Sequence, residues 1–206
     1  MNQRRPSISS FHRVRAIFSL TVAAALISTG CLGRSPEVRH YILGSFGSGT
    51  EAASAKDVAV LVGPVRLPAY LERPQIARLE SGGLVELDET NRWLGGFEEN
   101  FLRALTSGLA RKLGSVKIVQ HPSRAPFSLD YRVQLHVDDL IDVTGEALRV
   151  RIRWSLQIEG AEEPAEIFLM QESVPIKSSG SQGVVEAHEV ALDRLVQSIA
   201  KAIAVK

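Results

Sequence analysis

The chain has 206 residues, of which 24 are Lys or Arg and 23 are Asp or Glu, and it contains a single cysteine. Residues 1–30 hold four of the arginines and no acidic side chain, so residues 31–206 carry 20 basic groups against 23 acidic ones. A mildly acidic chain without a basic stripe is a poor candidate for binding nucleic acid, and one cysteine excludes an intramolecular disulfide.

A secretory signal peptide is predicted for residues 1–30. Arginines occur within residues 1–15, an apolar run follows over residues 16–27, and small residues then lead to Cys31. This order of basic, apolar and small residues is typical of a cleaved export signal. The apolar run is also shorter than the roughly 20 residues that a membrane-spanning helix needs.

The position of Cys31 favours a lipoprotein. Lipoprotein signal peptidase cleaves before a cysteine that becomes acylated, so we expect cleavage between Gly30 and Cys31. A diacylglycerol and an N-acyl chain on Cys31 would then anchor the protein, with no other cofactor. The alternative is ordinary secretion with Cys31 as a free thiol. In enterobacterial lipoproteins an Asp after the cysteine retains the protein at the inner membrane, so Leu32 favours the periplasmic face of the outer membrane, with inner-membrane retention as the alternative.

The rest of the chain predicts one α+β domain. Residues 31–56 are expected to hold the acylated N-terminus, a short strand at 39–43 and a flexible linker, and residues 57–206 a single domain. The elements expected there, in chain order, are a buried strand at 57–64, a hairpin of 75–80 and 84–88 around two glycines, a helix at 97–113, a short strand at 116–120, a meander of strands at 129–137, 148–158 and 166–174, and a terminal helix at 184–204. We predict a mainly antiparallel β-sheet with two amphipathic helices packed on one face.

Periodicity carries the strongest of these predictions. In residues 97–113 large apolar side chains recur at every fourth position, Glu98 and Glu99 stand in the first turn, and Gly114 follows as a cap. In residues 148–158 apolar and polar side chains alternate strictly, which is typical of an antiparallel strand with one face in water.

No catalytic or metal-binding constellation stands out, so we predict that the chain is not an enzyme. It contains no nucleophile elbow, no nucleotide-binding loop and no zinc-protease motif. The histidines after residue 30 are scattered over loop, strand and helix, and His188 is predicted to lie on the packing face of the terminal helix. An envelope hydrolase is therefore disfavoured.

The meander contains an acidic group and a group of arginines, and each group allows two interpretations. The acidic residues at 138, 139 and 142 can form a cation site, but near a hairpin they are typical of turns, with Asp138 opposite Arg149 or Arg151. The arginines at 149, 151 and 153 can bind lipid phosphates or an acidic partner. The alternative is a solvated face that neighbouring carboxylates neutralise.

A proline-rich segment is the best candidate for a contact surface. Three prolines fall within a short stretch that has few free backbone donors, so the chain there is stiff and difficult to bury in a sheet. An ordinary rigid connection is the alternative. The residues that we predict to bind a partner are Pro64, Leu67, Pro68, Tyr70, Leu71 and Arg73.

The same segment carries a family resemblance. Residues 62–78, which read VGPVRLPAYLERPQIAR, closely resemble the signature of the ABC-type transport auxiliary lipoproteins, the PqiC-like family of membrane integrity-associated transporter subunits. Other features of the family follow in the same order: the acylated cysteine, the run at residues 39–43, Asn91-Arg92-Trp93, the helix that contains Asn100-Phe101-Leu102, and a final Ala-rich helix. Leu94-Gly95-Gly96 departs from the acidic-Pro step that is usual after the tryptophan.

The resemblance implies a non-enzymatic subunit of an MCE-type intermembrane lipid transport system. Such an outer-membrane lipoprotein would dock the periplasm-spanning MCE-domain protein, and with it the inner-membrane transporter, to the outer membrane. A homo-oligomer around the conduit is a further expectation from the resemblance. The alternative is an independent periplasmic lipoprotein that binds lipid itself, which would need an apolar cavity of several hundred Å³.

Overall fold

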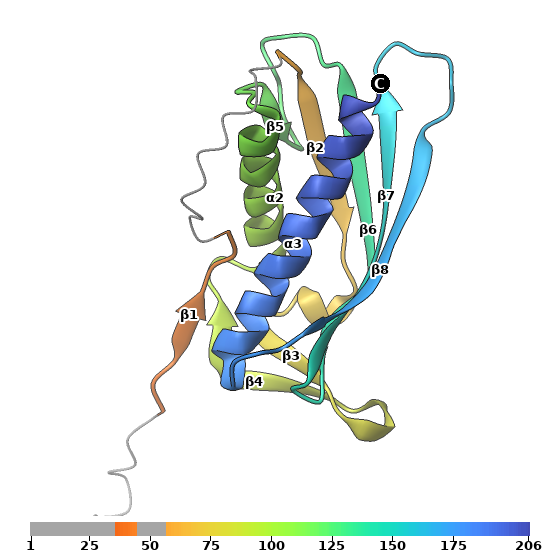
Figure 1. Ribbon diagram of the computed structural model, residues 1–206. Coiled ribbons are helices and arrows are strands. Elements are labelled where there is room, and N and C mark those ends of the chain that lie inside the picture. Colours follow the sequence, from red (N-terminus) through yellow and green to blue (C-terminus); the bar gives the residue numbers. More distant parts are fainter. Residues whose placement is uncertain (1–35, 45–56) are drawn as a thin grey trace, which may run out of the picture. The chain divides into compact units, whose positions relative to one another are not determined.

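The computed structural model describes residues 36–44 and 57–206, and all the elements in these ranges belong to one unit, Val38–Lys206. The strands are β1 (Arg39–Tyr41), β2 (Val60–Arg66), β3 (Gln75–Leu79), β4 (Val85–Trp93), β5 (Ile118–Gln120), β6 (Tyr131–Val143), β7 (Ala147–Ile158) and β8 (Glu166–Pro175). The helices are α2 (Phe97–Leu113) and α3 (Gly180–Ala204), and single turns form η1 (Ala69–Leu71) and η2 (Ser81–Gly83). The α+β class is confirmed (Figure 1).

The strands form one sheet, which is mixed, so the prediction of a mainly antiparallel sheet was wrong. Strands follow the order β1-β4-β3-β6-β2-β5, and β7 and then β8 continue from the other edge of β6. The pairs β1–β4, β2–β5, β2–β6 and β3–β6 are parallel, whereas β3–β4, β6–β7 and β7–β8 are antiparallel. The parallel partners come from distant parts of the chain, and a pattern of alternation identifies a strand without identifying its neighbour.

The meander of β6, β7 and β8 is confirmed. Its antiparallel register runs from Tyr131 opposite Ile158 to Val143 opposite Ala147, with one irregularity between Val137 and Asp139. Alternate residues of β7 are buried under the helices, and the residues between them are exposed on the outer face. This is the alternation expected of a sheet with one face in water.

Helix α2 begins and ends where the periodicity predicts. Gly114 ends it in the left-handed conformation, with a φ of 64°, and its N–H donates to carbonyls of the last turn. At the other end the buried Asn100 side chain donates to the carbonyl of Gly96 at 2.7 Å and to that of Leu94. The Gly114 contacts satisfy carbonyls that the last turn of a helix leaves without partners, and the Asn100 contacts tie the preceding turn to the start of α2.

Helix α3 begins at Gly180, four residues before the predicted start at Val184. Ser181, which the sequence places in a loop, donates from its hydroxyl to Asp88 of β4 at 3.0 Å. A contact to a residue so far away in the sequence cannot be predicted from local periodicity.

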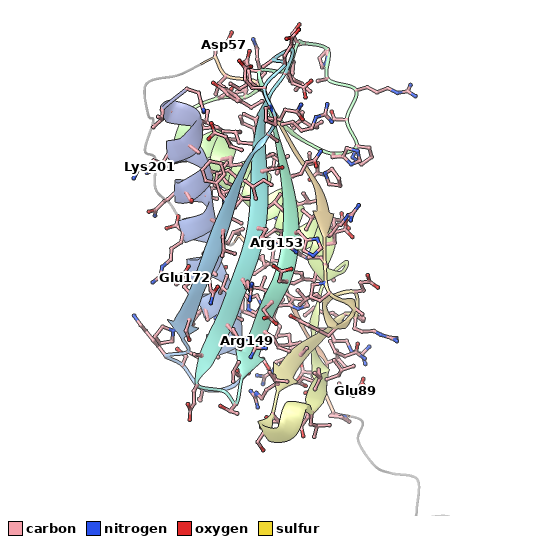
Figure 2. The ribbon with its side chains drawn as sticks, turned by 90° about the vertical axis from the view of Figure 1, so that its right-hand side faces the viewer. Asp57, Glu89, Arg149, Arg153, Glu172 and Lys201 are labelled. Carbon is pink, nitrogen blue, oxygen red and sulfur yellow. The ribbon has the colours of Figure 1, made fainter. Side chains whose placement is uncertain are left out.

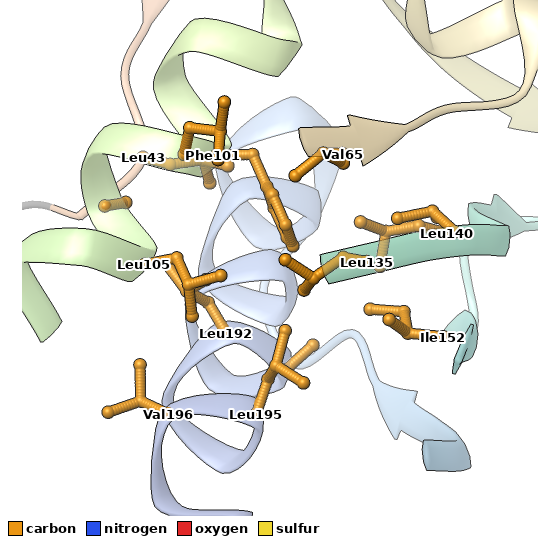
Figure 3. Packing of buried hydrophobic residues seen from close by; sticks show 14 of the residues in the cluster. Leu43, Val65, Phe101, Leu105, Leu135, Leu140, Ile152, Leu192, Leu195 and Val196 are labelled. Atoms are coloured by element: carbon orange, nitrogen blue, oxygen red, sulfur yellow. The ribbon is translucent and has the colours of Figure 1, made fainter. Parts of the chain in front are cut away.

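The core lies between the sheet and the two helices, which cover one face of it as predicted (Figures 1 and 3). Leu105 and Leu195 of the helices and Ile152 of β7 are almost fully buried there. The helices approach closely at Gly108, where an added Cβ would lie only 2.7 Å from a methyl carbon of Val196. Leu43, which follows β1, is also buried, so the short predicted strand at residues 39–43 packs against this unit.

The predicted hairpin around Gly82-Gly83 is confirmed as β3 and β4. The two strands pair antiparallel from Leu79 opposite Val85 to Gln75 opposite Arg92, with a register shift next to Gln75. We call residues 81–87 the hairpin tip. Three of its side chains are exposed apolar groups, at 59% for Leu84, 39% for Val85 and 37% for Leu87.

Candidate functional site

The proline segment, residues 64–73, begins within β2 and continues through the turn η1. Its first residue, Pro64, lies within a register shift between β2 and β6, because Val62 and Val65 are consecutive partners of β6 and the residues between them bulge out. Gly63 has a φ of 104° and is joined to Pro64 by a cis peptide bond. A bulge is a position where a strand tolerates a proline, since no ladder hydrogen bond is lost.

The apolar side chains of this segment pack inward, although the sequence indicated a stretch that is difficult to bury and predicted that Leu67, Tyr70 and Leu71 bind a partner. Leu71 is only 4% exposed and belongs to the core, and Leu67 and Tyr70 are half-buried against it. The Tyr70 hydroxyl accepts a hydrogen bond from the backbone N–H of Leu140 at 3.1 Å. Burial raises the pKa of Tyr70 above its ordinary value. A partner can therefore reach only part of the predicted set.

Leu67, Leu71 and Glu72 of the segment line a depression of about 520 Å³. Pro64 and Arg73 are exposed, and Pro68 is half-buried. The depression lies between η1 and the start of α2, and sequence reasoning did not predict it because its walls come from three separate stretches. Its lining includes Leu67, Leu71, Glu72, Gly95, Glu98, Glu99, Leu102, Gln120 and His121.

Acidic side chains dominate the rim of this depression. Glu72 follows η1, and Glu98 and Glu99 stand in the first turn of α2; all three are exposed. Gly95 and Gly96, with φ values of 76° and 93°, shape the turn that leads into α2. Leu67 and Leu102 add apolar surface. The arrangement suits an extended segment with basic and apolar side chains.

The arginines of β7 are paired with carboxylates on the outer face, as one of the two interpretations predicted (Figure 2). Asp138 accepts from Arg153 at 2.6 and 2.9 Å, and Asp139 accepts from Arg149 at 3.2 Å. Asp138 lies at the irregularity between Val137 and Asp139, and its carboxylate makes its shortest contacts with Arg153. The Nε of Arg151 is farther from the same carboxylate, at 3.8 Å. Hydrogen bonding to Arg153 is the main cause of a lowered pKa of Asp138.

Asp142 has a structural role in a turn, as predicted, and also a partner that the sequence did not indicate. Its carboxylate is 1% exposed and accepts from the backbone N–H of Gly145 at 2.8 Å. Its other oxygen accepts from Nε of Arg78 at 2.6 Å. The hydrogen bond to Asp142 raises the pKa of Arg78, so this pair ties β3 to the end of β6.

His188 lies on the packing face of α3, as predicted. It is 5% exposed and its Nδ1 lies 2.8 Å from the carbonyl oxygen of Val184. The rings of Trp93 and Phe97 meet it edge-on at 5.3 and 5.7 Å. Burial lowers the pKa of His188 to about 4.

In residues 36–44 and 57–206 no group of three or more His, Cys, Asp or Glu side chains is arranged to hold a metal ion. None of the helices within those ranges is long and apolar enough to cross a membrane. Gly30 and Cys31 lie outside the described residues, as do the signal peptide and most of the linker, so cleavage and acylation stay predictions.

Comparison with known proteins identifies one matching family and several solved structures with a similar fold. A family model described as the ABC-type transport auxiliary lipoprotein component matches residues 41–200. No curated protein matches the sequence. Among solved structures, a crystal structure of an uncharacterized protein has a TM-score of 0.65 at 15% identity, over 82% of this chain and 99% of that chain. Protein XCC0632 from Xanthomonas campestris, of family DUF330, has a TM-score of 0.56 at 12% identity, over 80% and 90% of the two chains. At these identities the likeness of the structures concerns the fold alone.

Proposed function

We propose that this chain, which belongs to the family of ABC-type transport auxiliary lipoprotein components, is the outer-membrane subunit of an MCE-type intermembrane lipid transport system. The family is one of transport components and not of enzymes, and the match confirms the resemblance of residues 62–78. In this proposal acyl chains on Cys31 hold the protein at the periplasmic face of the outer membrane. The folded domain docks the periplasm-spanning MCE-domain protein and thereby the inner-membrane transporter.

The stiff proline segment beside an acidic depression is the observation that supports docking. Pro64 and Arg73 are exposed on a backbone that the prolines hold in place, and a preformed surface loses little conformational entropy when a partner binds. The carboxylates of Glu72, Glu98 and Glu99 favour a partner segment with basic side chains.

Capture of the acylated protein from its native envelope in mild detergent tests this proposal. The double variant Glu72→Arg/Glu99→Arg reverses the charge of the rim at exposed positions and should lose the co-purifying MCE-domain protein. The double variant Glu162→Arg/Glu163→Arg makes the same charge change at exposed positions of the β7–β8 loop and should retain it. The mass of the solubilised complex would show whether the subunit also self-associates.

Two results would contradict the proposal in different ways. Equal capture by both double variants would mean that the partner binds elsewhere on the protein. Recovery of the lipoprotein without an MCE-domain protein, but with stoichiometric phospholipid, would favour the independent periplasmic lipid-binding lipoprotein.

A further inference from the structure

The hairpin tip exposes apolar side chains in a way that the core does not explain. Leu84, at 59% exposed, lies in the turn, and Val85 and Leu87 stand two residues apart on β4, so they lie on the same face of the strand. Glu86 lies between them, in register with Arg78 of β3. Single exposed apolar residues are ordinary, whereas three exposed apolar residues within four positions concentrate apolar surface at the hairpin tip.

The chain that leads to Cys31 leaves the sheet at the same end as this tip. Strand β1 is parallel to β4, with Arg39 opposite Asn91 and Tyr41 opposite Trp93. Because the strands are parallel, the chain before Arg39 approaches from the side on which Val85 precedes Asn91. Figure 1 shows β1, β3 and β4 at one end of the unit and β5 and the C-terminus at the other.

The length of chain between Cys31 and β1 limits where an anchoring membrane can lie. Arg39 stands eight positions after Cys31, and this length of chain spans at most about 28 Å. Leu84 is seven residues from Asn91 along β4, or at most about 24 Å. The opposite end of the sheet is farther, because the 13 residues of β6 extend about 40 Å. Anchoring at Cys31 therefore allows the hairpin end to reach the bilayer, and the far end lies at a greater distance from the tether.

We propose that the hairpin tip, through Leu84, Val85 and Leu87, contacts the lipid bilayer that holds the acyl chains of Cys31. The tip adds a second, shallow contact in the interfacial region, where apolar side chains and polar backbone are both accommodated. Together with the acyl chains it sets the orientation of the domain on the membrane. This inference rests on the acylation that the proposed function also assumes, and not on the identity of the transport partner.

A fluorescent label on the acylated, full-length protein tests the contact. Acylation converts the sulfur of Cys31, the only cysteine, to a thioether, so Leu84→Cys introduces a single reactive thiol. Val116→Cys is the matched control, because Val116 is 95% exposed and lies two residues before β5 at the far end. Each variant carries an environment-sensitive dye and is reconstituted alone into vesicles of phosphatidylethanolamine and phosphatidylglycerol that contain a nitroxide-labelled lipid.

We expect a blue-shifted emission and several-fold stronger quenching by the nitroxide lipid at position 84 than at position 116. Equal quenching at the two positions would overturn the proposal. So would protection of position 84 from both the nitroxide lipid and an aqueous quencher, because a second copy of the chain would then cover the tip. Mass spectrometry that finds Cys31 unmodified in protein from native membranes would overturn the shared premise. Loss of partner capture with lipid contact retained would contradict only the proposed function.

Discussion

The proline segment and the hairpin tip lie close together in the chain and use apolar side chains in opposite ways. Leu71 of the first is 4% exposed, and Leu84 of the second is 59% exposed. Helix α2 covers the first region, where Leu71 and Phe97 line the same depression, whereas neither α2 nor α3, the helices in the described part of the chain, covers the tip. In these two regions the presence of prolines does not predict which apolar side chains are exposed. The proline segment contributes a leucine to the core, whereas the Gly-Gly turn exposes apolar side chains to solvent.

Truncation of one leucine in each region should give the largest difference between the two regions in the free energy of unfolding. Leu71→Ala leaves a cavity in the core and should lower the free energy of unfolding by about 2–5 kcal/mol. Leu84→Ala removes a side chain that is mostly in water and should change it by less than about 0.5 kcal/mol. Urea unfolding of both variants, followed by circular dichroism, measures the difference. Similar losses in the two would show that the tip is also packed.

The packed region should also respond to acid. Burial lowers the pKa of His188 to about 4 from an ordinary 6.5, so the folded protein binds this proton more weakly than the unfolded chain does. The stabilisation from neutral His188 is complete above pH 6.5 and is lost toward pH 4, by up to about 1.4 kcal/mol per pH unit. The His188→Gln variant should flatten this slope in urea unfolding between pH 6.5 and 4, and His121→Gln, at an exposed position, should retain it. An unchanged slope in His188→Gln would contradict the assignment.

The smallest expected effect within the packed region comes from one hydroxyl. Tyr70→Phe keeps the ring but removes the acceptor of the Leu140 N–H, a donor in a buried residue. The loss should be about 1–3 kcal/mol, with the fold retained. Thermal unfolding compared with the unchanged protein measures it. An unaltered midpoint would mean that water replaces the hydroxyl and that this side of the segment is more open than the structure indicates.

Local patterns predicted much of the fold. Fourfold spacing of large apolar residues defines α2 from Phe97 to Leu113, and alternation defines the strands of the meander. The parallel pairings were not predictable, because β2 meets β6 about 70 residues later through the register of Val60 opposite Tyr131. Nothing local to either strand encodes that choice.

The sequence indicated a stretch to consider as a contact surface but not the geometry around it. The proline-rich stretch indicated residues 64–73, yet the alternation of exposed and buried positions within it depends on α2, which packs from elsewhere in the chain. The depression needs Gln120 and His121 from a third stretch. At the hairpin, Val85 and Leu87 alternate with Glu86 as buried residues of a sheet do, so their exposure could not be predicted from the pattern.

The close approach of α2 and α3 at Gly108 has a consequence for how the family can diverge. An added methyl group at position 108 would overlap Val196, so an alanine there requires a smaller residue at 196. We expect that a larger residue at position 108 is accompanied by a smaller residue at position 196, which lies 88 residues later in the chain. A covarying small-large pair at these sites in aligned related sequences would mark the helix crossing.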